Sequence, residues 1–127
     1  MTAREAATEL QRLAGILDAR PTDPAYWRHA GTPAQWLHRV AALAGEDEAA
    51  FWRALGSGSM WAGIGSVANQ ALAVNPGWPE AAWEADQAAL REGLARLASA
   101  LRERAREAGR TSHPDLESWL SIFESSA

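Results

Sequence analysis

Apolar and polar residues alternate along this chain with a period of three to four positions, the spacing that places apolar side chains on one face of an α-helix. The first such stretch predicts a helix over residues 3–19, and Thr2 with Glu5 forms a T-x-x-E capping box at its start. Pro21 is expected to end this helix. Its apolar face comprises Ala6, Leu10, Leu13 and Leu17.

Two shorter helices are predicted before the middle of the chain. One begins at Thr32, which is followed by proline and forms a T-x-x-Q capping box with Gln35, and Gly45 is expected to end it. The acidic run at 46–48 then opens the next helix, because the positive end of the helix dipole favours negative charge. Gly56 is the expected C-cap of that helix. Its apolar side comprises Phe51, Trp52 and Leu55.

The segment GSGSMWAGIGS, residues 56–66, interrupts the helical pattern with glycine and serine. A Walker phosphate loop needs a lysine, which the sequence lacks, and a nucleophile elbow needs a preceding strand, whereas FWRAL before the segment is helical. We therefore predict a packed connector whose glycines permit close approach of the backbone. An anion site where Ser66 caps the next helix is the alternative. The packing residues would be Met60, Trp61, Ile64 and Val67.

The second half of the chain predicts a short helix over 66–74, a long one over about 79–108 and a last one that Ser112 begins. Gly109 is expected to end the long helix. An apolar seam follows the long helix at heptad-like spacing: Trp83, Gln87, Leu90, Leu94, Leu97 and Leu101. No stretch has the alternation of a strand. We therefore expect residues 1–127 to form one all-α domain, a bundle of five to six helices.

The composition narrows the classes of function. The 127 residues include no cysteine, which excludes disulfides and thiolate chemistry. The formal net charge of -4 and the scattered arginines disfavour nucleic acid and favour a basic protein partner. Seven tryptophans are unusual for this length, and tryptophan is a residue of both cores and interfaces. Because the sequence has no apolar signal region and no membrane-spanning window, we expect a cytoplasmic protein.

No catalytic or metal-binding pattern stands out in the sequence. The three histidines, His29, His38 and His113, fall in different predicted elements, so a base for a serine nucleophile is not indicated. No His and Glu pair has the spacing of metal ligands on one helix face. We therefore expect a protein that is not an enzyme and uses no metal or other cofactor.

A resemblance rests on the order of motifs between residues 33 and 108. The residues that carry it are Trp36, Leu37, Phe51, Trp52, Leu55, Gly63, Ile64, Gly65, Ser66 and Asn69. In this order the chain resembles small bacterial helical domains of unknown function that have a Gly-Met-Gly-Ser-x-Asn-Asp motif after a helical pair. Here Ile64 replaces the methionine, the asparagine comes one position later and Gln70 replaces the acid. In size and acidity such domains resemble immunity proteins, which are encoded beside secreted bacterial toxins.

Together these features favour a non-enzymatic protein-binding domain. The specific hypothesis is an immunity protein that neutralises a cognate toxin in the bacterial cytosol. Two alternatives remain open: a small-ligand-binding or enzymatic domain that uses the segment 56–66, and an oligomerising module built on the long helix. The chain would be a monomer or a homodimer.

Two groups of residues combine acids with tryptophan, as contact with a basic partner requires. We favour the first group because Trp78 lies between glycine and proline, outside the helical periodicity. A hydrophobic staple onto the long helix is the alternative role of Trp78. The first group is Trp78, Glu80, Glu84, Met60 and Trp61. The second group is Glu46, Asp47, Glu48 and Trp52.

Overall fold

A computed structural model of the chain describes residues 1–19, 27, 29–63, 65–72, 80–112 and 114–125. Within these ranges every regular element is a helix, which confirms the all-α prediction. The elements are α1 (Ala3–Asp18), α2 (Pro33–Glu46), α3 (Glu48–Leu55), α4 (Gly58–Trp61), α5 (Val67–Leu72), α6 (Glu80–Glu107) and α7 (Pro114–Ser125). The six longer elements match predicted helices. The short α4 lies inside the Gly/Ser segment, where the hydrophobic pattern predicted no helix.

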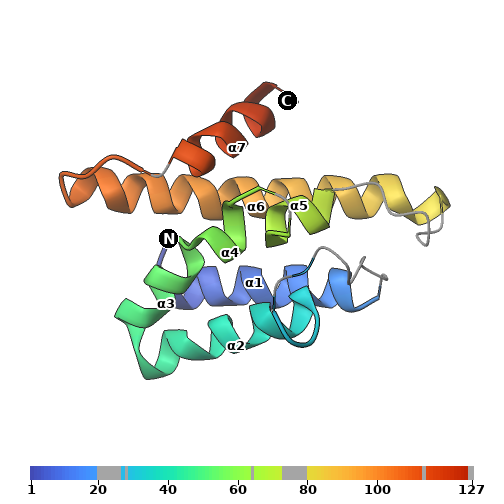
Figure 1. The fold of residues 1–127 in the computed structure, drawn as a ribbon, viewed down its shortest axis with the longest axis horizontal. Helices are drawn as coiled ribbons and strands as arrows, with labels where there is room; N and C mark the ends of the chain where they lie inside the picture. Colours follow the sequence, from blue (N-terminus) through green and yellow to red (C-terminus); the bar gives the residue numbers. More distant parts are fainter. Residues whose placement is uncertain (20–26, 28, 64, 73–79, 113, 126–127) are drawn as a thin grey trace.

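The longest helix, α6, runs the length of the molecule, and the other helices pack on two of its sides (Figure 1). α7 lies on one side, while α1, α2, α3 and α4 lie on the other. α1 packs against both α2 and α6, and α7 packs against α6. α6 therefore lies between the two sides and contacts both. Among the described residues, no helix has both the length and the apolar character that crossing a bilayer demands.

Side-chain caps fix where the first two helices begin. The Thr2 hydroxyl accepts the N–H of Glu5 at 3.1 Å, and the Glu5 carboxylate accepts the N–H of Thr2 at 2.9 Å. Thr32 and Gln35 form the same reciprocal pair at the start of α2, at 3.1 and 3.0 Å. Both predicted capping boxes are confirmed.

The predicted end of α2 is wrong. The helix does not stop at Gly45 but continues through Glu46, because Asp47 is the first residue to leave the helical conformation, with φ -151° and ψ 91°. The Asp47 carboxylate then accepts the N–H of Ala50 at 3.1 Å and caps α3. One aspartate therefore ends one helix and begins the next.

α7 begins at Pro114, and the residue before it lies outside the described residues, so the cap predicted for this helix stays a prediction. The Ser112 hydroxyl is hydrogen-bonded to the Glu117 carboxylate in α7. Ser112 therefore ties the incoming segment to the side of the helix.

The buried face of α6 is the predicted leucine seam. Three of its leucines are completely buried: Leu90, Leu94 and Leu97. The fourth, Leu101, is half-buried. Gln87 is also buried, and its amide nitrogen donates to the carbonyl oxygen of Ala71 at 2.7 Å, which satisfies a polar group inside the core. The Trp83 side chain lies outside the described part of the structure. The described seam is covered by the chain's own helices.

The Gly/Ser segment packs as a connector, as predicted. Met60 and Trp61 in α4 are 0% and 2% exposed. The indole N–H of Trp61 donates to the carbonyl oxygen of Leu55 at 2.8 Å. The indole N–H of Trp119 in α7 donates to the carbonyl oxygen of Trp61 at 2.7 Å. Trp61 therefore joins the end of α3 to α7.

Ser66 caps α5, as predicted. Its hydroxyl accepts the N–H of Asn69 at 3.1 Å and donates to the carbonyl oxygen of Gly63 at 2.9 Å. Val67 follows it into the core, whereas Ile64 lies outside the described residues. Because Ser66 is itself completely buried, its hydroxyl serves the connector and is not open to a bound anion.

A charged network and a glycine bring α1 close to α6. The Glu9 carboxylate on α1 pairs with Arg12 and, at 2.8 Å, with Arg96 on α6. A Cβ atom at Gly93 would lie 2.5 Å from the Glu9 carboxylate and 2.7 Å from Leu13. The two helices approach this closely because position 93 carries no side chain.

Gly93→Ala should lower the free energy of unfolding by about 1–3 kcal/mol, because the added methyl group would displace the buried Leu13 side chain. The better helix propensity of alanine, worth about 1 kcal/mol, offsets only part of this cost. Gly15→Ala on α1 is the matched control, because nothing lies within 4 Å of its Cβ position, and it should gain stability. Urea unfolding of both variants measures the difference. Equal shifts would contradict a close approach at Gly93.

The Glu9 network should make stability depend on pH. Burial raises the pKa of the Glu9 carboxyl, but hydrogen bonds from Arg12 and Arg96 lower it more strongly, and the net shift is downward. The ionised form therefore stabilises the fold above the unfolded-state pKa, and this contribution is lost as the pH falls through the folded-state pKa. Glu9→Gln should cost about 1 kcal/mol at about pH 7 and less at about pH 2, because protonation of the wild-type carboxyl weakens its ion pairs as the pH falls.

Denaturant midpoints at the two pH values test this dependence. Glu92→Gln is the control, because it removes the exposed partner of Arg96 and leaves the Glu9 pairs in place. The control should change stability less than Glu9→Gln does. A cost for Glu9→Gln that is the same at both pH values would show that ionisation of Glu9 contributes nothing.

Candidate functional site

The first predicted binding group is not assembled on the described surface. Met60 and Trp61 lie in the core, and the Trp61 indole N–H bonds the carbonyl oxygen of Leu55 in α3. Glu84 is exposed on α6. Trp78 and the side chain of Glu80 lie outside the described residues. A partner-binding role for this group stays a prediction.

The second predicted group is brought together at the start of α3. Glu46, Asp47 and Glu48 are exposed at the corner between α2 and α3. Trp52 follows one turn later and is 8% exposed. Its indole N–H points to the Glu48 carboxylate at 3.4 Å. This group is therefore an acidic corner beside a mostly buried indole ring.

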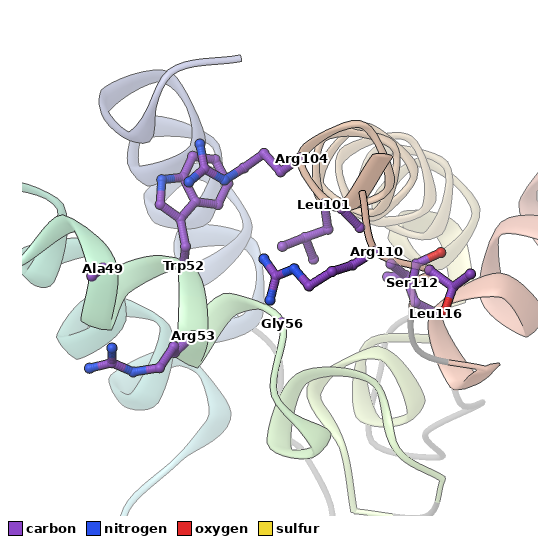
Figure 2. Close-up of a pocket in the computed structure, with 11 residues that line it drawn as sticks. Ala49, Trp52, Arg53, Gly56, Leu101, Arg104, Arg110, Ser112 and Leu116 are labelled. Atoms are coloured by element: carbon purple, nitrogen blue, oxygen red, sulfur yellow. The ribbon is translucent and has the colours of Figure 1, made fainter. Parts of the chain in front are cut away.

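A pocket of about 430 Å³ opens on the other side of Trp52, between α3, the C-terminal end of α6 and the segment that leads into α7 (Figure 2). Three arginines line it, and no described acidic residue does. The lining residues are Ala49, Trp52, Arg53, Gly56, Leu101, Arg104, Ala105, Arg110, Thr111, Ser112 and Leu116. The pocket therefore combines a cationic character with an apolar wall.

The three arginines come from different parts of the fold. Arg53 is in the last turn of α3, Arg104 is in the last turn of α6, and Arg110 follows the end of α6. The guanidinium carbon of Arg104 lies 4.0 Å from the centre of the Trp52 ring, a cation–π contact. Figure 2 shows Arg110 reaching from the α6 side toward Gly56, at the end of α3. Trp52 and Arg104 thus form one wall, and Arg110 extends across the opening.

A Schellman turn at the end of α6 places Arg110. The N–H of Arg110 donates to the carbonyl oxygen of Ala105 at 2.7 Å, and the N–H of Gly109 donates to that of Arg106 at 3.0 Å. Gly109 has φ +70°, a conformation that glycine adopts at little cost. The turn folds the chain back on the helix and directs the following residues toward α3. The prediction that Gly109 ends the helix is confirmed.

Two carboxylates on the helices that line the pocket, Glu117 and Glu48, are already engaged. Glu117 is bonded to the Ser112 hydroxyl and lies 4.0 Å from Arg102. Glu48 accepts the indole N–H of Trp52. Among the described residues, no carboxylate lies within 4.0 Å of a guanidinium nitrogen of the three lining arginines. The positive charge of the pocket is therefore not neutralised by the part of the chain that the structure describes.

His29 makes a contact that the sequence did not predict. Its Nε2 atom lies 2.8 Å from the Ser59 hydroxyl, within hydrogen-bond distance. The imidazole also stacks on Trp36, with ring centres 6.2 Å apart. A serine nucleophile needs a base that a third group orients, and no described residue bonds the other ring nitrogen of His29. The contact links the segment before α2 to α4.

The other histidines do not join this contact. His38 pairs with Asp18 at 3.2 Å on the exposed surface. His113 lies outside the described residues. Within the described ranges, no group of three or more His, Asp or Glu side chains is placed to hold a metal ion.

Sequence reasoning did not single out Arg53, Arg104 and Arg110 as one site. Gly109 gave the only local signal, because a C-terminal glycine of this kind turns the next residue back toward the helix. The contact between Arg104 and Trp52 depends on how α6 lies against α3, which no local pattern encodes. Trp52 was predicted as part of the acidic group, and the structure shows that it also lines the arginine pocket.

Comparisons with protein-family models, with curated proteins and with solved structures found no match. The resemblance to small bacterial helical domains and to immunity proteins therefore stays a prediction.

Gly109→Ala should lower the free energy of unfolding by about 1–2 kcal/mol, because a residue with a Cβ atom is strained at φ +70°. No atom lies within 4 Å of the Cβ position, so the cost is conformational and not steric. Gly45→Ala in α2 is the control, since its surroundings are equally open and its backbone is helical, and it should not lose stability. Thermal unfolding measures both variants. A Gly109→Ala variant as stable as the control would show that the turn tolerates a side chain.

Proposed function

We propose that this chain is a non-enzymatic domain that binds another protein through the surface around Trp52. One arrangement supports the proposal most directly. Trp52 lies beside three exposed acids at the corner between α2 and α3, and it also lines a pocket that has three exposed arginines. No part of this proposal requires a catalytic group.

A surface of this kind suits protein recognition for two reasons. Tryptophan and arginine are the residues most enriched among those that dominate binding energy at interfaces, and here Trp52 and Arg104 are already stacked on each other. Charges of both signs on either side of the indole would orient a partner whose own charges are complementary. The contact between Trp52 and Arg104 also restrains both side chains before binding, which reduces the entropy that binding must overcome.

The specific form of the proposal is an immunity protein that neutralises a bacterial toxin in the cytosol. The net charge of -4 supports this form, because a basic toxin would be attracted to the whole chain and to the acidic corner at 46–48. The small size and the high tryptophan content agree with it. The resemblance of the motif order to small bacterial domains points the same way.

A small-ligand-binding domain is the second candidate, and the volume of the pocket favours it. About 430 Å³ lies within the range of about 300–1,000 Å³ that small-molecule sites occupy. Gly56, the first residue of the Gly/Ser segment, lines this pocket. The rest of that segment is used for packing around Trp61. A ligand would therefore bind beside the segment and not within it.

The third candidate, an oligomerising module built on α6, has less support. The described leucines of its seam are covered by other helices of the same chain and are not free for a second copy. Whether the chain is a monomer or a homodimer stays a prediction. Sedimentation analysis of the purified chain measures this directly.

Ala49→Trp should separate binding from stability. Ala49 is exposed at the rim of the pocket, so an indole there would obstruct the surface without disturbing the core. We expect the affinity for a protein encoded beside this gene to fall at least about tenfold, while the melting temperature changes by no more than about 2 °C. Isothermal titration calorimetry and thermal unfolding measure the two quantities. If the partner is a toxin, it should kill cells that co-express the Ala49→Trp variant and should not kill cells that co-express the wild type.

Ala42→Trp is the matched control, because Ala42 is exposed on α2 and does not line the pocket. It makes the same chemical change at another surface and should leave the affinity unchanged. Equal affinities for the two variants would place the interface elsewhere. If no protein encoded beside the gene binds the wild type, the immunity proposal fails.

A further inference from the structure

We infer that the arginine pocket between α3 and α6 binds carboxylate side chains of an acidic segment in a partner protein. This inference rests on the proposed function, because it assigns the chemistry of one half of the proposed interface. It also reverses the expectation from net charge alone. A chain with a net charge of -4 is expected to meet a basic partner, whereas this pocket is suited to an acidic one.

The pocket carries positive charge that no described acidic side chain neutralises. Arg53, Arg104 and Arg110 are exposed, and no described carboxylate pairs with any of them. Elsewhere in the described chain arginines do pair with nearby acids, as Arg96 does with Glu9 and Glu92. Like charges gathered in one pocket repel one another, so an anion that enters it relieves this repulsion as well as forming its own contacts.

The main hydrogen-bond donors of the pocket are the guanidinium groups of its arginines. A guanidinium group presents a planar fork of N–H groups that matches the two oxygens of a carboxylate. Arginines from the end of α3, the last turn of α6 and the segment after α6 all line this pocket. Thr111 adds a hydroxyl that bonds no described residue. Several carboxylates on one flexible segment can meet this set more completely than one small anion can.

Part of the pocket wall is apolar. Trp52, Leu101 and Leu116 line the same pocket as the arginines. The aliphatic stem of a glutamate can pack on such surfaces while its carboxylate meets a guanidinium group. An inorganic anion has no group that would use them. This combination therefore favours acidic side chains of a peptide segment over a free phosphate ion.

The acidic corner on the other side of Trp52 limits how far the ligand extends. Glu46, Asp47 and Glu48 would repel an acidic segment that ran past the indole ring. A long phosphodiester chain, which carries a charge at every unit, would meet this repulsion along its path. A short acidic stretch that ends at Trp52 would not. The arginines thus define the site, and the acids of the corner define its boundary.

The experiment measures binding of a fluorescein-labelled hexaglutamate peptide to the full chain by fluorescence anisotropy. Hexaglutamine is the uncharged counterpart and should bind at least about tenfold more weakly. Arg110→Gln should weaken hexaglutamate binding about tenfold, and Arg53→Gln should weaken it several-fold. Arg39→Gln, on exposed α2 outside the pocket, removes the same charge and should change the affinity less than about twofold.

Five results would overturn the inference. Wild-type protein that does not bind hexaglutamate, or binds hexaglutamine equally well, lacks a carboxylate site. Equal losses in Arg110→Gln and Arg39→Gln would mean attraction to the overall charge and not to the pocket. Displacement of the peptide by inorganic phosphate at the same molar concentration would mean a small-anion site. Tighter binding of a hexathymidylate oligonucleotide than of hexaglutamate would mean a nucleic-acid site.

Two combinations of binding results distinguish a wrong carboxylate site from a wrong protein-binding function. If a protein partner binds, and Ala49→Trp blocks it while Arg110→Gln does not, the interface stands and the acidic-segment inference is wrong. If hexaglutamate binds in the predicted way but no protein partner does, the pocket has the inferred chemistry and the protein-binding function is wrong. Thermal unfolding of Arg110→Gln and Arg53→Gln confirms that each variant is folded. Both variants must weaken hexaglutamate binding for the inference to hold.

Discussion

The burial of Trp61 is the constraint on which the candidate site depends. Its indole N–H satisfies the carbonyl oxygen of Leu55 at the end of α3, and its own carbonyl oxygen accepts the indole N–H of Trp119 in α7. Both bonds lie in a part of the core where an unsatisfied backbone group would be costly, so they fix how α3, α4 and α7 meet. The walls of the arginine pocket come from α3, from the end of α6 and from the start of α7. The Gly/Ser segment thus serves the site indirectly, by holding the elements that line it.

The fold could be predicted from the sequence where its cause is local. The capping boxes at Thr2 and Thr32 involve residues three positions apart, and the leucine seam of α6 follows from the helical period. The failure at Gly45 has a local cause too. Gly109 adopts a positive φ and turns the chain at the end of α6, whereas Gly45 does not adopt one and stays inside α2. At this corner the side-chain cap of Asp47 determines where the backbone changes direction.

The candidate site could be predicted only in part, because its two halves have different origins. The acidic corner is contiguous in sequence, and residues 46–48 with Trp52 were recognisable as a group. The pocket is assembled from three separated segments, and the contact between Arg104 and Trp52 exists only because α6 lies against α3. Net charge does not reveal this pocket for the same reason, since an average over the whole chain conceals a local group of arginines. Only the spatial arrangement shows that one surface carries both signs.

The separation of charge across this surface follows from a rule that acts on each helix by itself. Acids favour the N-terminal end of a helix and cations the C-terminal end, and α3 follows the rule with Asp47 and Glu48 at its start and Arg53 in its last turn. α6 follows it with Arg104 in its own last turn. The fold then brings these two C-terminal ends together around one pocket, so that side chains placed for helix stability become a cluster. Partial charges at the helix ends offset part of the repulsion between the arginines, but they cannot supply the bidentate contacts that a carboxylate would. The same residues can therefore stabilise the free chain and remain available to a partner.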